Sequence, residues 1–244
     1  MRRMIDRTKV AALIPAFAEE RHIRTVATRA RAQLETVLVV DDGSPDRTAE
    51  EARAAGVEVL RHEVNQGKGA AIKTGLRALT EKPGIEYILV LDGDGQHLPE
   101  EIPHFLAEAR RSGAPMIVGS RMGDLKKMPL VRKLTNLTMS RLISRACGQS
   151  IPDSQCGFRM FRRDLAVAFL ACPSTKYDFE TEMLVLASRR GCAIAAASVS
   201  TIYGGETSKI HPVRDTIRFV QLMVRLRRAA AVAPAVVTSG AAVG

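Results

Sequence analysis

Two carboxylates separated by a single glycine stand directly after an apolar run: Asp92-Gly93-Asp94 follows Leu89-Val90-Leu91. Like charges this close repel, and each carboxyl resists ionisation beside the other. Mg²⁺ or Mn²⁺ prefers carboxylate oxygens, would cancel this repulsion and would keep coordination positions for the oxygens of a diphosphate. Gln96 could add a neutral oxygen. The pattern therefore predicts a divalent cation site, with an exposed acidic turn as the alternative interpretation.

A second acidic pair, Asp41-Asp42, ends the apolar run 36–40 and is followed by Gly43-Ser44-Pro45. These residue types are common in turns, which gives one interpretation. A carboxylate at a strand end can also accept hydrogen bonds from a base or a ribose, as in dinucleotide-binding folds. The pair alone does not decide between a turn and a nucleoside site.

A glycine-rich segment, Asn65-Gln66-Gly67-Lys68-Gly69, precedes a predicted helix. It is not a P-loop, because His62 stands where that motif requires its first glycine. Lys68 and the N–H groups of the helix N-terminus could still contact a phosphate. A tight helix start without a ligand is the alternative.

Short runs rich in Val, Ile and Leu alternate with amphipathic segments through the first half of the chain. We expect strands at residues 10–14, 36–40, 57–60, 87–91 and 116–118, the first stopped by Pro15, and helices at 19–33, 46–55, 68–79 and 99–111. Apolar strands joined by helices are typical of α/β proteins with a Rossmann-like, mainly parallel sheet and helices on both faces. Ligands bind such sheets at the carboxyl ends of the strands, where both acidic pairs fall.

The second half of the chain is expected to shape the site of a second substrate. It predicts helices at 128–147 and 178–190 and strands at 156–161 and 193–203. Beyond residue 211 a basic stripe repeats at helical spacing: Arg214, Arg218, Arg225 and Arg228. We therefore expect a catalytic domain at 1–211 and a basic amphipathic helix with a flexible tail at 212–244. That helix could contact an anionic membrane surface, a membrane partner subunit or its own domain.

Composition narrows the class of protein. The 244 residues carry a net charge of +10, which favours an anionic partner, and the absence of Trp argues against a stacking platform for nucleic acid. The four cysteines form no C-x-x-C pair, so neither a zinc site nor a redox motif is indicated. We find no signal peptide and no run of about 20 apolar residues, and expect a cytoplasmic protein, peripheral at the inner face of the membrane.

An ordered series of motifs runs from about residue 9 to residue 220. It comprises Ile14-Pro15-Ala16-Phe17-Ala18-Glu19, Val39-Val40-Asp41-Asp42-Gly43-Ser44, Asn65-Gln66-Gly67-Lys68-Gly69, Asp92-Gly93-Asp94-Gly95-Gln96-His97, Gly119-Ser120-Arg121 and Asp153-Ser154-Gln155-Cys156-Gly157-Phe158-Arg159. The series resembles the family 2 glycosyltransferases of GT-A fold. The resemblance is strongest to the branch of polyprenyl-phosphate (dolichyl-phosphate) mannosyl- and glucosyltransferases.

The resemblance implies a role for each matching position. The nucleotide-sugar-binding residues would be Pro15, Ala16, Glu19, Asp41, Asp42, Lys68, Asp92, Gly93 and Asp94. Asp92, Asp94 and Gln96 would hold Mg²⁺ or Mn²⁺ with the diphosphate. Asp94 would be catalytic together with Arg121 and Arg132, which would contact donor or acceptor phosphates.

Two positions depart from the pattern of the family. Ala18 replaces a usual Asn, which could alter contacts with the nucleoside. Gly93 replaces a usual Ala, which we expect to widen the floor of the pocket.

The expected reaction is inverting, metal-dependent transfer of a hexose from a nucleotide sugar, GDP-mannose or a UDP-sugar, to polyprenyl phosphate. A lipid phosphate is already anionic and needs no general base, whereas a hydroxyl acceptor does. The runner-up is therefore transfer to a glycan or small-molecule hydroxyl, with Asp178, Glu180 or Glu182 as the base. The non-enzyme alternative, a basic module that binds nucleic acid, lacks a recognisable motif, and we expect no nucleic-acid partner.

Overall fold

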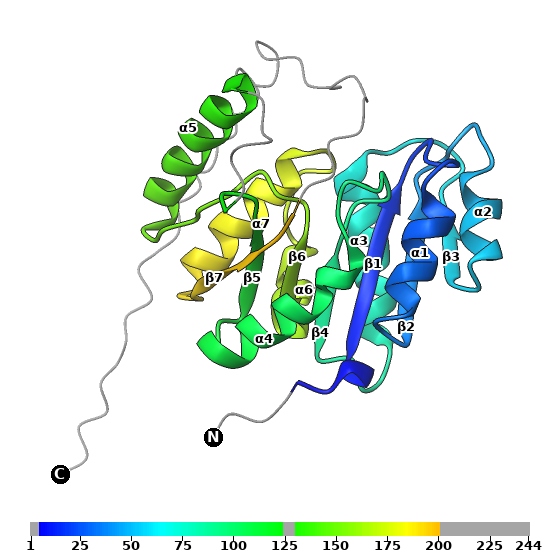
Figure 1. The fold of residues 1–244 in the computed structure, drawn as a ribbon, viewed down its shortest axis with the longest axis horizontal. Coiled ribbons are helices and arrows are strands. Elements are labelled where there is room, and N and C mark those ends of the chain that lie inside the picture. The colour runs from blue at the N-terminus through cyan, green and yellow to red at the C-terminus, as the bar shows by residue number, and fades with distance from the viewer. Residues whose placement is uncertain (1–4, 124–129, 201–244) are drawn as a thin grey trace. The chain divides into compact units, whose positions relative to one another are not determined.

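A seven-stranded sheet in the order β3-β2-β1-β4-β6-β5-β7 forms the centre of the computed structural model (Figure 1), which describes residues 5–123 and 130–200. The strands are β1 (Val10–Ala16), β2 (Thr36–Asp41), β3 (Glu58–Arg61), β4 (Tyr87–Val90), β5 (Met116–Ser120), β6 (Arg159–Arg162) and β7 (Ile194–Ser198). All neighbouring strands pair in parallel except β6, which is antiparallel to β4 and β5. The predicted mainly parallel sheet is confirmed.

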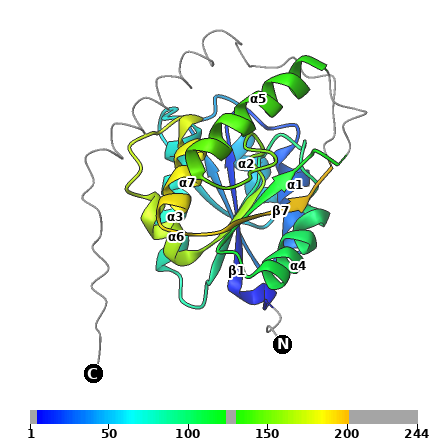
Figure 2. The same cartoon turned by 90° about the vertical axis from the view of Figure 1, so that its left-hand side faces the viewer.

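Seven α-helices within the described residues connect the strands. They are α1 (Ile23–Arg31), α2 (Thr48–Ala54), α3 (Lys68–Glu81), α4 (Ile102–Ser112), α5 (Leu130–Cys147), α6 (Arg163–Phe169) and α7 (Asp178–Arg189). The helices α1 and α4 cover one face of the sheet, and α3, α6 and α7 cover the other (Figure 2). No helix in the described part of the chain is long and apolar enough to cross a membrane.

Side chains of β1 alternate between the two helical layers. Ala12 and Ile14 belong to the apolar cluster that includes Ile23 of α1 and Phe105 of α4. Leu13 points the other way, toward α3, where a Cβ at Gly75 would lie 2.1 Å from its Cδ1. The helix therefore needs glycine there to approach the strand closely.

Pro15 does not stop the first strand, which corrects our expectation. Its residue pairs with Val40 of β2, and β1 continues to Ala16. The ladder with β4 ends three residues earlier, at Leu13 and Val90. The backbone carbonyl of Leu13 points toward β4, and the backbone of Pro15, two residues later, points the same way. Because the ladder with β4 has already ended there, the missing N–H of Pro15 costs no hydrogen bond between strands. The carboxyl end of β1 is thus left open on the β4 side.

The second half of the chain differs from the prediction in detail. Strand β6 begins at Arg159 rather than at residue 156, and the short helix α6 was not predicted. Strand β7 ends at Ser198, and residues 199–200 are not part of it; residues 201–203 of the predicted strand lie outside the described residues. The domain boundary at 211 and the basic helix of 212–244 lie outside the described residues and stay predictions.

Candidate active site at the carboxyl ends of the parallel strands

Asp42 anchors the loop that leads into α3. Its side chain is buried, its Oδ1 accepts the Gln66 N–H at 2.9 Å, and its Oδ2 accepts the Gly67 N–H at 2.8 Å. The His62 Nδ1 lies 2.7 Å from Asp42 Oδ1, and its Nε2 lies 2.9 Å from Thr74 Oγ1. The structure thus gives Asp42 loop partners, and the predicted contact of Asp42 with a nucleoside stays a prediction.

Asp41 lies beside Asp42 at the end of β2 and is fully buried. Its Oδ1 accepts the Ser44 N–H at 3.1 Å and also the Ser44 hydroxyl, while Arg61 Nε lies 3.2 Å from its Oδ2. Arg61 is thus an ion-pair partner of that Oδ2, but no N–H or O–H group in the described structure meets it with the geometry of a hydrogen bond. A buried acceptor without a donor is costly. Asp41 therefore has unused acceptor capacity at the site predicted for the nucleoside.

The loop after β1 runs along the same turn. The Ala18 N–H donates to Ser44 Oγ at 2.9 Å, and the Glu19 N–H donates to Thr48 Oγ1 at 2.8 Å. Pro15 and Ala16, the other residues predicted for the nucleoside, are buried at the end of β1. These bonds join the first two predicted motifs in space, and α1 begins at residue 23 rather than 19.

The Ala18 backbone is unusual. Its φ of 57° is left-handed, the only such value at a non-glycine residue in the described structure. Asn tolerates this region far better than Ala does. The replacement of Asn by Ala therefore places a residue that disfavours this conformation at position 18, while its effect on contacts with the nucleoside stays a prediction.

Lys68 is held between two carboxylates. Its Nζ lies 2.6 Å from Asp92 Oδ1 and 3.1 Å from Glu180 Oε2. Burial disfavours the ammonium, but the two carboxylates outweigh burial, and the pKa of Lys68 is raised. Burial likewise opposes the charge of Asp92, yet Lys68, together with His97 and Arg159, outweighs burial and the pKa of Asp92 is lowered. Lys68 is therefore charged and stands at the predicted cation site.

Asp94 is the less compensated member of the acidic pair. Burial raises its pKa, and the charge of Asp92 raises it further. Its Oδ1 accepts the Gln96 N–H at 2.9 Å. His97, which follows, is buried against Phe158 with ring centroids 5.3 Å apart. The charge of Asp92 thus acts on Asp94, and a bound cation would offset this repulsion.

The donor set fits a hard cation that shares its ligands with a substrate. No three His, Cys, Asp or Glu side chains in residues 5–123 and 130–200 are grouped to hold a metal ion. Mg²⁺ commonly needs only one or two carboxylates and takes its other ligands from phosphates and water. Asp92 and Asp94 match this pattern, while the role of Gln96 as a ligand stays a prediction.

Two glycines near the pair have different surroundings. A Cβ at Gly157 would lie 2.5 Å from Asp92 Oδ2, so glycine lets the loop before β6 approach the carboxylate. A Cβ at Gly93 would instead contact Ile23, Ala16 and Ile14 at 3.3–3.5 Å. A Cβ at Gly93 would thus point into the apolar core and not into the site, which corrects the expectation that this glycine widens the floor of the pocket.

Arg121 is engaged by a buried carboxylate. Its Nε and Nη2 donate to Asp153 Oδ2 and Oδ1 at 2.7 and 2.9 Å, and Asn136 Nδ2 donates to Oδ1 at 2.9 Å. Asp153 is fully buried. Arg121 and Asp153 belong to two separate sequence motifs, and the ion pair between them was not predicted. Contact of Arg121 with a phosphate stays a prediction, and so does that of Arg132, because the side chains of 130–132 lie outside the described structure.

Sequence reasoning missed the role of Arg159, although the motif that ends in Gly157-Phe158-Arg159 contains it. The side chain is 2% exposed and donates to three backbone carbonyls. Its Nε and Nη2 reach the carbonyls of Cys156 and Ser154 at 2.8 Å, and its Nη1 reaches that of Glu180. Arg159 thereby ties the loop beside Asp92 to α7.

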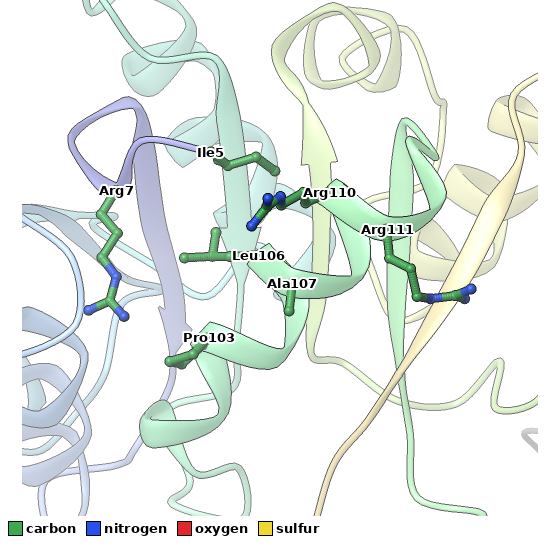
Figure 3. Close-up of a pocket in the computed structure, with 7 residues that line it drawn as sticks. All are labelled: Ile5, Arg7, Pro103, Leu106, Ala107, Arg110 and Arg111. Carbon is green, nitrogen blue, oxygen red and sulfur yellow. The ribbon is translucent and has the colours of Figure 1, made fainter. Parts of the chain in front are cut away.

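A pocket of about 550 Å³ lies elsewhere, along α4 and the segment before β1. It is lined by apolar side chains and three arginines (Figure 3): Ile5, Arg7, Pro103, Leu106, Ala107, Arg110 and Arg111. None of the predicted site residues lines it. The chemistry therefore points to the strand ends, not to this pocket.

Comparison with known proteins gives the family. A family model described as glycosyl transferase family 2 matches residues 11–169, which hold the Asp41, Asp92, Arg121 and Asp153 motifs. The chain belongs to this family. It is a glycosyltransferase, and the predicted family is confirmed.

Two relatives of this chain are named for a polyprenyl phosphate. The UDP-N-acetylglucosamine--dolichyl-phosphate N-acetylglucosaminyltransferase of Methanococcus voltae is 30% identical over 213 residues, covering 78% of this chain and 84% of that protein. The undecaprenyl-phosphate mannosyltransferase of Micrococcus luteus is 30% identical over 206 residues, covering 80% and 84%. This glycosyltransferase therefore has polyprenyl-phosphate sugar transferases among its relatives.

Solved structures confirm the predicted GT-A fold. The crystal structure of glucosyl-3-phosphoglycerate synthase from Mycobacterium tuberculosis in complex with Mn²⁺, uridine-diphosphate and phosphoglyceric acid matches with a TM-score of 0.68. The match has 18% sequence identity and covers 93% of this chain and 80% of that one. At this identity the likeness shows the fold alone.

Proposed function

We propose that this glycosyltransferase moves a hexose from a nucleotide sugar to a polyprenyl phosphate, with inversion and with Mg²⁺ or Mn²⁺. The observation that carries the proposal is the Asp92–Asp94 pair at the carboxyl end of β4, with the Lys68 ammonium 2.6 Å from Asp92. Acidic and basic groups placed together suit a metal-bound diphosphate. The names of the relatives support a lipid phosphate as the acceptor.

The donor would lie across the ends of β1, β2 and β4. Asp41 has a buried oxygen without a donor, which a base or ribose could supply. Asp92 and Asp94, with Gln96, would hold the cation. When bound, the cation would neutralise the charge that develops on the leaving nucleoside diphosphate. Lys68 would orient the diphosphate from the start of α3.

The acceptor side supports phosphate as the nucleophile. Two of the three carboxylates considered as a base already have other partners. Glu182 is buried and accepts the Ser174 N–H at 3.0 Å and its hydroxyl at 2.8 Å. Glu180 forms an ion pair with Lys68. A lipid phosphate is deprotonated at neutral pH, so it has to be positioned rather than activated. Arg121 and Arg132 are proposed for that positioning.

The test combines three donors with two acceptors. The purified chain is incubated with GDP-mannose, UDP-glucose or UDP-N-acetylglucosamine, and with either a prenyl phosphate or a prenyl alcohol of the same length. We expect a glycosylated phosphate with one donor, detected by mass spectrometry, and no product on the alcohol. Product on the alcohol alone would overturn the choice of acceptor.

Asp94→Asn tests the cation. This change should abolish transfer and remove the Mn²⁺-dependent thermal stabilisation by the nucleoside diphosphate, because ligands stabilise the folded state by mass action. Full activity of this variant in EDTA would refute a metal at Asp94. Circular dichroism serves as the control that the fold is intact.

The membrane contact is tested on the predicted basic helix. Near an anionic leaflet each basic residue contributes about 1 kcal/mol. Reversing Arg214, Arg218, Arg225 and Arg228 to Glu should therefore release the protein from anionic liposomes at low salt and spare nucleotide binding. Wild-type cosedimentation of that variant would remove this helix as the contact. The proposed site of action is the cytosolic face of the membrane.

A further inference from the structure

Three charged residues, Glu180, Lys68 and Asp92, lie together at the proposed site, and we call them the Lys68 cluster. They come from α7, α3 and the end of β4. The side chains are 14%, 16% and 24% exposed, respectively. Lys68 Nζ bridges the two carboxylates at 2.6 Å to Asp92 and 3.1 Å to Glu180.

The backbone brings Lys68 to Glu180. Gly67 precedes α3 with a φ of 102°, and the Ala70 N–H donates to the Thr175 carbonyl at 2.9 Å. A Cβ at Gly69 would lie 2.7 Å from Phe179 Cβ, so glycine permits this contact between the two helix starts. The first turn of α3 is therefore packed on the start of α7, and Lys68 points into the site.

Asp92 has two competing cationic partners under the proposed function. In the structure its Oδ1 is next to the Lys68 ammonium, whereas the proposed divalent cation needs the same carboxylate. An ammonium and a divalent cation repel each other at such distances. Lys68 must therefore leave Asp92 when the cation binds. Glu180 keeps acceptor capacity for it, because its buried Oε1 has no hydrogen-bond partner in the described structure.

We propose that Glu180 is a positioning residue that retains Lys68 when Asp92 turns to the cation. Resting on the proposed donor and cation site, the proposal adds a function for Glu180. Glu180 draws the ammonium away from Asp92, which favours cation binding. It also keeps the ammonium beside the diphosphate rather than releasing it to solvent. Glu180 thus acts on the cation through Lys68 and not as a ligand.

The experiment measures Mn²⁺ affinity by electron paramagnetic resonance of free Mn²⁺, with and without UDP or GDP. Lys68→Met should tighten Mn²⁺ binding in the absence of nucleotide, because the competing ammonium is gone, and should weaken nucleotide binding. Glu180→Gln should weaken Mn²⁺ binding about tenfold, the usual size for a residue behind the ligands. In the K68M/E180Q double variant, the effect of Glu180→Gln should disappear.

Asp178→Asn is the matched control, since it removes the same charge from the same turn of α7. It should leave Mn²⁺ affinity within about twofold, because Asp178 is not one of the two carboxylates that hold Lys68. An equal loss in this control, or a loss from Glu180→Gln that persists in the Lys68→Met background, would overturn the proposal. Either result would mean that Glu180 acts by charge alone or as a ligand.

Conservative variants serve if a neutral variant does not fold. Glu180→Asp and Lys68→Arg keep both charges and should stay within about threefold of wild-type Mn²⁺ affinity, whereas a tenfold loss in either would count against a positioning role. Mn²⁺ binding by the wild type distinguishes a failure of the proposed function from a failure of the role of Glu180 alone. If the wild type binds no Mn²⁺ even with nucleotide, the proposed function fails as well. If it binds Mn²⁺ and the variants behave otherwise than stated, only the role of Glu180 fails.

Discussion

Replacing Arg159 tests how the loop beside the acidic pair is held. A hydrogen bond from a charged donor contributes about 1.5–3 kcal/mol, so the three bonds of Arg159 would sum to roughly 5–9 kcal/mol. The burial of the guanidinium, which is 2% exposed, offsets part of this sum. Removing the guanidinium leaves three carbonyl oxygens without this donor, and an unsatisfied buried acceptor costs about 1–3 kcal/mol. We therefore expect Arg159→Met, which keeps apolar bulk, to lower the free energy of unfolding by at least about 3 kcal/mol.

The assay is urea unfolding followed by circular dichroism, with Arg162→Met as the matched control. Arg162 lies on the same strand, but its side chain is 47% exposed and forms an ion pair with Asp164. Such surface pairs contribute about 0–1 kcal/mol. Arg159→Lys should fall between the two, because one ammonium cannot reach three carbonyls. An Arg159→Met chain as stable as the Arg162→Met control would refute the reasoning.

Three further predictions concern single positions. Ala18→Gly should raise the free energy of unfolding by about 0.5–1 kcal/mol, because glycine relieves the left-handed backbone; an unchanged urea midpoint would contradict this. Burial opposes the charge of Asp153, but Arg121 outweighs it and lowers its pKa. The stability that Asp153 contributes is therefore present above pH 3.8 and lost as the pH falls further, so the deficit of Asp153→Asn in urea unfolding should shrink in that range. Gly157→Ala should displace the Asp92 carboxylate and weaken Mn²⁺ binding about tenfold at a nearly unchanged melting temperature; wild-type affinity would show that the loop can move away.

The fold could be predicted as far as hydrophobic pattern determines it. The apolar runs at Val10, Val37 and Ile88 gave strands, and the segments between them gave helices, because these patterns depend on neighbouring residues only. The antiparallel direction of β6 could not be predicted in this way, because its apolar residues do not indicate whether the strand runs parallel or antiparallel to its neighbours. The prediction at Pro15 was wrong because a strand tolerates proline where no neighbouring strand needs its N–H. That condition depends on where β4 stops pairing with β1, which the local sequence does not show.

The position of the site, at the carboxyl ends of the parallel strands, could be predicted from the sequence. The rule that ligands bind at the carboxyl ends of parallel strands placed Asp41 and Asp92 in one region. The partners of the charged residues were not predictable. Lys68 with Glu180 and Arg121 with Asp153 join segments far apart in sequence, and local spacing carries no information about such contacts.

The late position of β6 in the chain has a consequence for synthesis. During translation β4 and β5 emerge first, yet they are not neighbours, and each needs β6 at its side. Until Arg159–Arg162 leaves the ribosome, both strands present unpaired edges, which favour association with other chains. The same segment delivers Gly157 to Asp92, so the acidic pair acquires its surroundings only when the sheet closes. A nascent chain is thus kept from assembling a donor site before its fold is finished.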